Sequence, residues 1–215
     1  MAACEHWRCV YIADPVADCI HRLGARGAAT QWPVNDKPQD LSVNGMHSLL
    51  VTCRDARKIK EFSSCGKLLR ELRLPGDVTE PHHAVQLTSG QFVVCHGFRH
   101  NAVNRVCKIS EDGRRAVQSH GGQRGSASGQ YDGPVHLAVD DNEFVFVADY
   151  YNRRVTLLSP TLGYIRQVTG SEDLKWCPLR LYLDARTRRL YVADNECKDG
   201  DLTAGRLSSL VSSSR

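Results

Sequence analysis

The sequence lacks most of the local patterns that mark membrane proteins, secreted proteins and nucleotide-using enzymes. No apolar run exceeds five residues, as at Phe144–Ala148, whereas a membrane-spanning helix needs about 20. Neither a G-x-x-x-x-G-K-[ST] phosphate loop nor a G-x-S-x-G nucleophile turn is present. Glu5, His6 and Arg8 interrupt the apolar stretch that a secretory signal requires. We therefore expect a cytoplasmic protein with no membrane contact.

The nine cysteines contain no C-x-x-C pair, which excludes zinc-finger spacing. Four of them, Cys19, Cys53, Cys95 and Cys107, fall in or beside apolar segments, and we interpret them as small buried hydrophobic residues. Charge is equally modest, since 28 basic and 24 acidic residues give a net charge of +4. With 41% apolar and 24% charged residues, the composition is typical of an ordinary globular domain.

One short sequence motif recurs along the chain: a run of β-forming residues that ends in a polar or thiol residue. The five copies are Val10–Asp14, Leu49–Cys53, Phe92–His96, Val145–Asp149 and Leu190–Asp194. Their last residues are separated by 39, 43, 53 and 45 positions. A period of about 40 to 50 residues is typical of four-stranded propeller blades, and no segment has the sustained apolar stripe of a helix.

The repeats predict an all-β fold, a β-propeller with about five visible four-stranded blades that form a partial or divergent six-bladed ring. The fourth repeat shows its strands best, at Gly133–Asp140, Glu143–Asp149, Arg153–Ser159 and Gly163–Gly170. We expect a single domain over residues 1–215, with repeats at about 8–36 (partial), 37–79, 80–132, 133–176 and 177–215 (partial). The first repeat should begin at its second strand. An open ring would expose strand edges, so self-association by strand sharing is a further expectation.

The fourth repeat resembles a known repeat family. Gly129–Asp140, Val145–Asp149 and Asn152–Val155 resemble the NHL repeat over a whole blade. The fifth repeat shows most of the same pattern at Pro178–Asp184 and Tyr191–Asp194. The second and third repeats are similar only loosely, because Cys53 and His96 stand where the family has Asp.

The whole chain resembles the C-terminal NHL propeller of tripartite-motif (TRIM-NHL) proteins, and Pro81–Phe92 is similar to invertebrate members. Those relatives carry a RING finger and B-boxes, which this sequence does not contain, so their ubiquitin-ligase activity is not implied here. We therefore expect a binding platform that is not an enzyme and uses no cofactor or metal.

The turn between the second and third strands of the fourth repeat contains a carboxylate and a guanidinium. Asp149 ends one strand and Arg154 begins the next, and across a hairpin such a pair can form a two-pronged hydrogen-bonded contact. Lys58, Arg105 and Arg206 occupy the same slot in other repeats. We interpret Asp149 and Arg154 as a structural pair that orients the turn.

Basic and aromatic residues are expected to gather on one loop face, where these turns and the links between blades meet in a propeller. They are Arg57, Lys58, Arg99, His100, Arg105, Arg124, Tyr150, Tyr151, Arg153, Lys175 and Trp176. Tyr, Trp and Arg are common in protein interfaces, so a protein partner is the first hypothesis. Single-stranded RNA is the alternative, because basic groups neutralise phosphates and rings stack on bases. DNA is not expected.

A second group lies two residues after a proline in four repeats, at Asp40, His83, His136 and Arg180. On the innermost strands of a propeller these residues would form a ring at the central channel. Histidines from different blades hold zinc in the peptidyl amidating lyases, which NHL propellers resemble, so a metal-dependent lyase is a further alternative. Only two of the four are histidines and Arg180 would repel a cation, so lining the channel is the favoured role.

Overall fold

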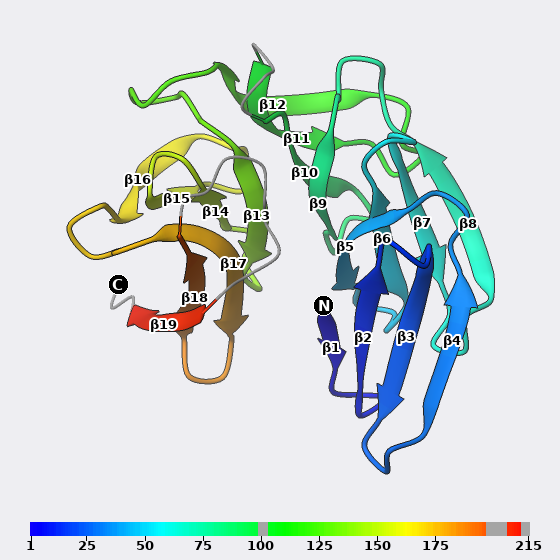
Figure 1. Ribbon diagram of the computed structural model, residues 1–215. Coiled ribbons are helices and arrows are strands. Elements are labelled where there is room, and N and C mark those ends of the chain that lie inside the picture. The colour runs from blue at the N-terminus through cyan, green and yellow to red at the C-terminus, as the bar shows by residue number, and fades with distance from the viewer. Residues whose placement is uncertain (99–102, 197–205, 212–215) are drawn as a thin grey trace. The chain divides into compact units, whose positions relative to one another are not determined.

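The computed structural model describes residues 1–98 and 103–196, and the backbone of 206–211. These residues form strands and no helix, in five antiparallel sheets (Figure 1). The all-β, propeller-type fold class predicted from the sequence is confirmed. No helix that could cross a membrane occurs in this part of the chain.

The strands follow one another in sequence order within each sheet. Sheet 1 contains β1 (Ala2–Cys4), β2 (Cys9–Asp14), β3 (Cys19–Gly24) and β4 (Ala29–Pro33). Sheet 2 contains β5 (Pro38–Val43), β6 (Leu49–Cys53), β7 (Lys58–Phe62) and β8 (Leu68–Arg73). Sheet 3 contains β9 (Pro81–Gln86), β10 (Phe92–His96), β11 (Val103–Ile109) and β12 (Ala116–Gln123). Sheet 4 contains β13 (Pro134–Val139), β14 (Val145–Asp149), β15 (Arg154–Leu158) and β16 (Tyr164–Thr169). Sheet 5 contains β17 (Cys177–Asp184), β18 (Arg189–Asn195) and β19 (Arg206–Val211).

The chain divides into two compact units. Unit 1 comprises Met1–Val94 and Lys108–Val117, and unit 2 comprises Cys95–Cys107 and Gln118–Arg215. Sheets 1 and 2 lie in unit 1, and sheets 4 and 5 lie in unit 2. The single domain over 1–215 stays a prediction.

The four expected strands of the fourth repeat agree with β13 to β16, while the first repeat differs. It contains a short first strand, β1, where we expected the repeat to begin at its second strand. β1 pairs with β2 from Ala2↔Tyr11 to Cys4↔Cys9, and Cys4 is buried. This three-residue strand lies outside the recurring sequence motif, so the repeat pattern did not predict it.

The central strands are buried on both sides, as continuous apolar runs predict. Every residue of β6, β10 and β14 is buried. In unit 1, Tyr11 and Ile20 of sheet 1 belong to one apolar core with Leu49 of sheet 2. In unit 2, Val135 and Phe146 of sheet 4 share a core with Leu190 of sheet 5. Neighbouring sheets within a unit therefore pack face to face, as propeller blades do.

The first strand of three sheets carries an irregularity at the same place. The register with the second strand shifts between Pro38 and Asp40 in sheet 2, between Pro134 and His136 in sheet 4, and between Pro178 and Arg180 in sheet 5. Proline has no N–H to donate to the ladder, which favours such a bulge. Asp40, His136 and Arg180 are therefore structurally equivalent positions, as their sequence spacing predicted.

Candidate functional site

The turn pair of sheet 4 is a fully connected polar network. Arg154 Nε donates to Asp149 Oδ2 at 2.7 Å, and Asn152 Nδ2 donates to the same oxygen at 2.8 Å. Asp149 Oδ1 accepts the amide N–H of Asp132 at 2.8 Å. The other guanidinium nitrogens of Arg154 donate to the carbonyl oxygens of Ser126 and Gln130, each at 2.7 Å. The pair therefore fastens the preceding link to the β14–β15 turn.

Burial controls the acidity of this carboxyl group. Asp149 has no exposed surface, and desolvation raises its pKa to about 6, although hydrogen bonds from Asn152, Arg154 and Asp132 oppose the shift. A buried charge is tolerated only when its hydrogen bonds are satisfied. Asp149 and Arg154 contact each other across the hairpin as predicted, but through one N–H···O bond and not the predicted two-pronged contact. The other guanidinium nitrogens bind backbone carbonyl oxygens, and both oxygens of Asp149 are engaged by the protein.

Several residues of the predicted loop face are committed to contacts inside the protein. Tyr150 is fully buried in the core of unit 2, which corrects its assignment to a surface. Arg124 Nε and Nη2 donate to the two carboxylate oxygens of Asp132 at 2.9 and 3.0 Å. Lys58 forms ion pairs with Asp36 and Glu71 at 3.1 and 2.8 Å in unit 1.

The remaining members of that face differ in exposure. Arg57, Arg153 and Lys175 are exposed, and Lys175 lies over the ring of Trp176 at 5.0 Å. Tyr151 is half-buried against Phe98, and Arg105 is half-buried. Arg99 and His100 lie outside the described residues. The protein and RNA partners assigned to this face stay predictions.

The predicted channel residues are mostly buried, and each can be placed within its own unit. In unit 1, Asp40 and His83 are only 2% and 3% exposed. His83 Nε2 lies 3.3 Å from the carbonyl oxygen of Leu41, so in the neutral ring Nε2 carries the proton and Nδ1 is the basic nitrogen.

In unit 2, His136 is buried and Arg180 is half-buried. His136 Nδ1 accepts the amide N–H of Leu181 at 3.3 Å, which ties β13 to β17. The neutral ring of His136 therefore carries its proton on Nε2, the same tautomer as His83. Nδ1 of His136 is therefore engaged by a backbone N–H within unit 2.

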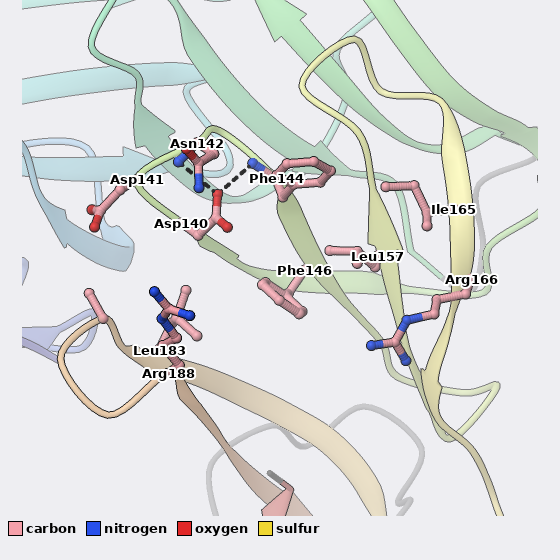
Figure 2. A pocket seen from close by; sticks show the side chains of 11 residues that line it. Asp140, Asp141, Asn142, Phe144, Phe146, Leu157, Ile165, Arg166, Leu183 and Arg188 are labelled. Atoms are coloured by element: carbon pink, nitrogen blue, oxygen red, sulfur yellow. Dashed lines mark hydrogen bonds between the residues drawn. The ribbon is translucent and has the colours of Figure 1, made fainter. Parts of the chain in front are cut away.

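Sequence reasoning missed a groove in unit 2 between sheet 4 and the β17–β18 hairpin (Figure 2). Its volume is about 830 Å³, within the usual range of ligand sites. Its walls are Asp140, Asp141, Asn142, Phe144, Phe146, Leu157, Ile165, Arg166, Leu183, Ala185 and Arg188.

Strand register explains how the groove combines apolar and basic groups. Phe146, Leu157 and Arg166 are cross-strand partners on β14, β15 and β16, so their side chains form one row on one face. Leu183 and Arg188 approach from the β17–β18 hairpin, and Figure 2 shows the two arginines on opposite sides of Phe146. The groove therefore presents an apolar floor flanked by two guanidinium groups.

Carboxylates fix both hairpins that border the groove. Asp140 Oδ1 accepts the amide N–H groups of Asn142 and Phe144 at 2.9 and 2.8 Å. Asp184 Oδ1 does the same for Arg186 and Thr187 at 3.0 and 3.1 Å. Such turns orient the backbone locally. Asp140 is therefore occupied by its own turn, while Arg166 and Arg188 are exposed toward solvent.

Comparisons with solved structures place this fold among known β-propellers. The streptogramin B lyase structure superposes with a TM-score of 0.66 at 17% identity, over 89% of this chain and 60% of that one. A luciferin-regenerating enzyme gives 0.66 at 13% identity, over 90% and 67%. Regucalcin from Agrobacterium tumefaciens, a calcium-binding protein, gives 0.64 at 11% identity, over 90% and 65%. No protein-family model matches the chain, and no curated protein matches it.

These similarities show the β-propeller fold. The chain spans about 60% of the length of the streptogramin B lyase. The closer resemblance to NHL repeats and TRIM-NHL proteins stays a prediction.

The same comparisons correct the expectation that the chain is not an enzyme. The lyase and the luciferin-regenerating enzyme are named as enzymes, so a propeller of this kind is no argument against catalysis. The expectation rested on the resemblance to TRIM-NHL proteins and on the absence of their RING finger and B-boxes from this sequence. Residues from separate strands of a propeller can assemble a catalytic site without those domains, so their absence does not exclude an enzyme.

Proposed function

We propose that the chain binds a small organic molecule with an apolar body and an anionic group in the groove of unit 2. The observation that carries this proposal is the row of Phe146, Leu157 and Arg166, faced by Arg188 across the floor. The apolar floor favours a hydrocarbon or aromatic body. Guanidinium groups pair with carboxylate or phosphate oxygens through two parallel hydrogen bonds.

The test is a ligand-observed NMR screen of aromatic and aliphatic carboxylates, each paired with its neutral amide. We expect carboxylates to bind more tightly than their amides. Arg166→Gln and Arg188→Gln should each weaken carboxylate binding and leave amide binding nearly unchanged, because they remove only the charge-assisted contact.

Arg186→Gln is the matched control. Arg186 is exposed on the same β17–β18 hairpin but is not part of the groove wall, so its replacement changes net charge by the same amount. Equal loss of binding in the Arg186 and Arg188 variants would attribute the effect to overall charge. Carboxylates that bind no better than amides would refute the proposal.

A catalytic role is the second candidate, favoured by the burial of Asp40 and His83 on β5 and β9 of unit 1. A buried carboxyl and a buried histidine are groups that perform general acid–base chemistry. The enzyme names among proteins of similar fold give this candidate weak support.

Its test is mass spectrometry of every compound of the screening library, whether or not it binds the groove, after incubation with the protein. Turnover that is lost in His83→Gln and Asp40→Asn, with groove binding intact, is the expected result. Turnover that persists in both variants would exclude these residues, and no product from any compound of the library would refute the catalytic role.

A further inference from the structure

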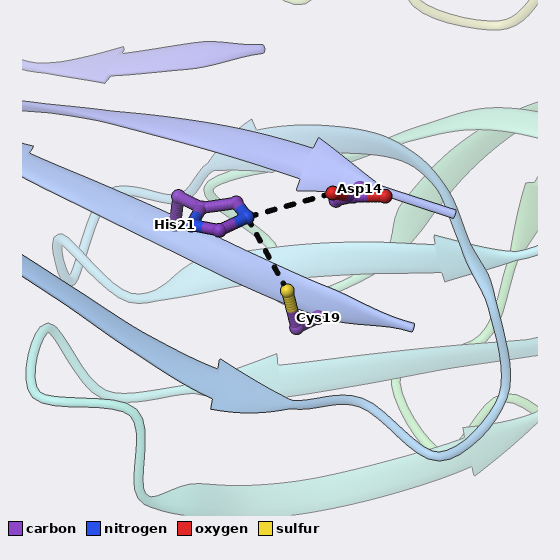
Figure 3. Close-up of side chains that lie close together, drawn as sticks. All are labelled: Asp14, Cys19 and His21. Carbon is purple, nitrogen blue, oxygen red and sulfur yellow. Dashed lines mark hydrogen bonds and ion pairs between the residues drawn. The ribbon is translucent and has the colours of Figure 1, made fainter. Parts of the chain in front are cut away.

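The β2–β3 hairpin of sheet 1 brings three different ligand types together. Asp14 and Cys19 are direct cross-strand partners, and His21 lies two residues beyond Cys19 on β3. Side chains two residues apart in a strand point to the same face. The carboxylate, thiol and imidazole therefore share one face of sheet 1, as Figure 3 shows.

The distances among the donor atoms are those of a chelating set. Cys19 Sγ lies 3.4 Å from His21 Nε2, and Asp14 Oδ2 lies 3.6 Å from the same nitrogen. All three donor atoms lie within 4.8 Å of one another. In a tetrahedral zinc site, with metal–ligand distances of about 2.0 to 2.3 Å, ligand atoms are about 3.3 to 3.6 Å apart.

The arrangement does not fit a nucleophilic relay. In a Cys–His–Asp relay the thiol contacts one ring nitrogen and the carboxylate contacts the other. Here both groups contact Nε2 of His21. The thiol, the carboxylate and the ring nitrogen therefore form a compact group and not a chain of contacts through the ring. A compact group of three donor atoms can surround a cation.

At the equivalent position of sheet 4, the carboxylate is paired with the positively charged side chain of an arginine. There Asp149 pairs across the hairpin with Arg154, whose guanidinium contacts the carboxylate. In sheet 1 the equivalent slot opposite Asp14 contains Cys19. Sheet 1 therefore keeps the carboxylate of the repeat, replaces the arginine by a thiol, and adds an imidazole two residues later.

The hairpin also fixes the orientation of Asp14 and leaves the cluster accessible to solvent. Asp14 Oδ1 accepts the amide N–H groups of Val16 and Ala17 at 3.0 and 2.8 Å, which directs the other oxygen toward His21. Asp14 and His21 are 36% and 38% exposed, so an ion can reach them from solvent.

We propose that Asp14, Cys19 and His21 form a binding site for Zn²⁺ or a similar thiophilic divalent cation, with water as the fourth ligand. A set of one thiolate, one imidazole and one carboxylate suits zinc and excludes the hard cations Mg²⁺ and Ca²⁺, which prefer oxygen ligands only. The site is independent of the unit 2 groove, since all its residues lie in unit 1.

The test uses Co²⁺ as a spectroscopic probe for the zinc site. Titration of the reduced, metal-free protein should produce the visible bands of four-coordinate cobalt and a near-ultraviolet thiolate-to-cobalt band, and Zn²⁺ should abolish both. Cys19→Ser should lose the thiolate band. His21→Gln and Asp14→Asn should weaken cobalt affinity by about tenfold or more.

Cys65→Ser is the matched control, because Cys65 is an exposed free thiol of unit 1 outside the cluster. It should keep both the band and the affinity. His21→Gln distinguishes a loss of metal binding from a loss of fold. Because the side chain of His21 is 38% exposed, the circular dichroism of this variant should match that of the parent protein. No cobalt bands in the parent, a thiolate band that survives in Cys19→Ser, or one lost in Cys65→Ser would overturn the proposal.

Discussion

The hairpins of sheet 1 and sheet 4 place a carboxylate at the same backbone position and surround it differently. In sheet 4, Asp149 is fully buried and its oxygens accept from a guanidinium, an amide side chain and a backbone N–H. In sheet 1, Asp14 is 36% exposed and contacts a histidine that also contacts a thiol. The repeat therefore provides a fixed slot whose chemistry depends on the residue opposite the carboxylate and on solvent access.

The difference shows what burial demands of a repeated motif. A carboxylate without solvent must receive its counter-charge and hydrogen bonds from the protein, and Arg154 with Asn152 supplies them in sheet 4. A carboxylate near solvent is free of that demand, so Cys19 and His21 can replace the arginine in sheet 1. Sheet 2 has no carboxylate at this position, since Cys53 stands there opposite Lys58, and Lys58 pairs instead with Asp36 of the preceding link.

The largest expected effect comes from Asp149→Ala. The change leaves the guanidinium of Arg154, whose side chain is 14% exposed, and the amide of Asp132 without their acceptor. We expect a loss of about 3 to 5 kcal/mol in the free energy of unfolding, the usual cost of breaking a buried pair. Urea denaturation of the parent and the variant measures it.

Asp14→Ala is the comparison variant for that measurement. Water can reach the groups that Asp14 leaves behind, so its unfolding midpoint should move much less. Equal losses at the two positions would show that burial does not distinguish the two hairpins.

A pH effect of intermediate size follows from the pKa of Asp149. Its folded value of about 6 lies above the value of about 3.9 for an unfolded aspartate, so the folded state binds the extra proton between these two pH values. Stability should fall by about 3 kcal/mol as the pH rises from about 4 to about 6, and stay level above that. Urea midpoints across this range, compared between the parent and Asp149→Asn, isolate the contribution. An identical slope in both proteins would assign it to other groups.

The smallest expected effect on stability comes from His21→Arg, which places a guanidinium beside Asp14 at a side chain that is 38% exposed, whereas Cys19 is only 8% exposed. An arginine facing an exposed carboxylate contributes little, because solvent screens the pair. The unfolding midpoint should therefore change less than in either preceding experiment, whereas cobalt binding should disappear. A large gain in stability would mean that solvent screens the ion pair in sheet 1 no more than it screens the pair in sheet 4.

Much of the fold could be predicted from the sequence, because strand patterns are local. Continuous apolar runs such as Phe144–Ala148 identify central strands buried on both faces, and turn residues mark their ends. The four strands of the fourth repeat and the recurring central strand of each repeat were found in this way. β1 was missed because Ala2–Cys4 is too short to carry a pattern.

The candidate sites were harder to predict, because exposure and convergence are not local properties. Tyr150 and Tyr151 are neighbours in the chain, yet Tyr150 is fully buried and Tyr151 only half-buried. The groove of unit 2 depends on a register that aligns Phe146 with Leu157 and Arg166. Cys19 was predicted as a small buried hydrophobic residue, and its low exposure of 8% agrees, but its contact with His21 was not foreseen.

The sequence by itself determined the strands, their order and the slots that face each other across each turn, since a period of two and a tight hairpin leave few alternatives. Only the tertiary structure decided at which of these positions the carboxylate is buried and at which it is exposed to solvent. That choice depends on the packing of one sheet against the next within a unit, and desolvation then determines whether a carboxylate needs an arginine, as at Asp149, or can face a thiol and an imidazole, as at Asp14.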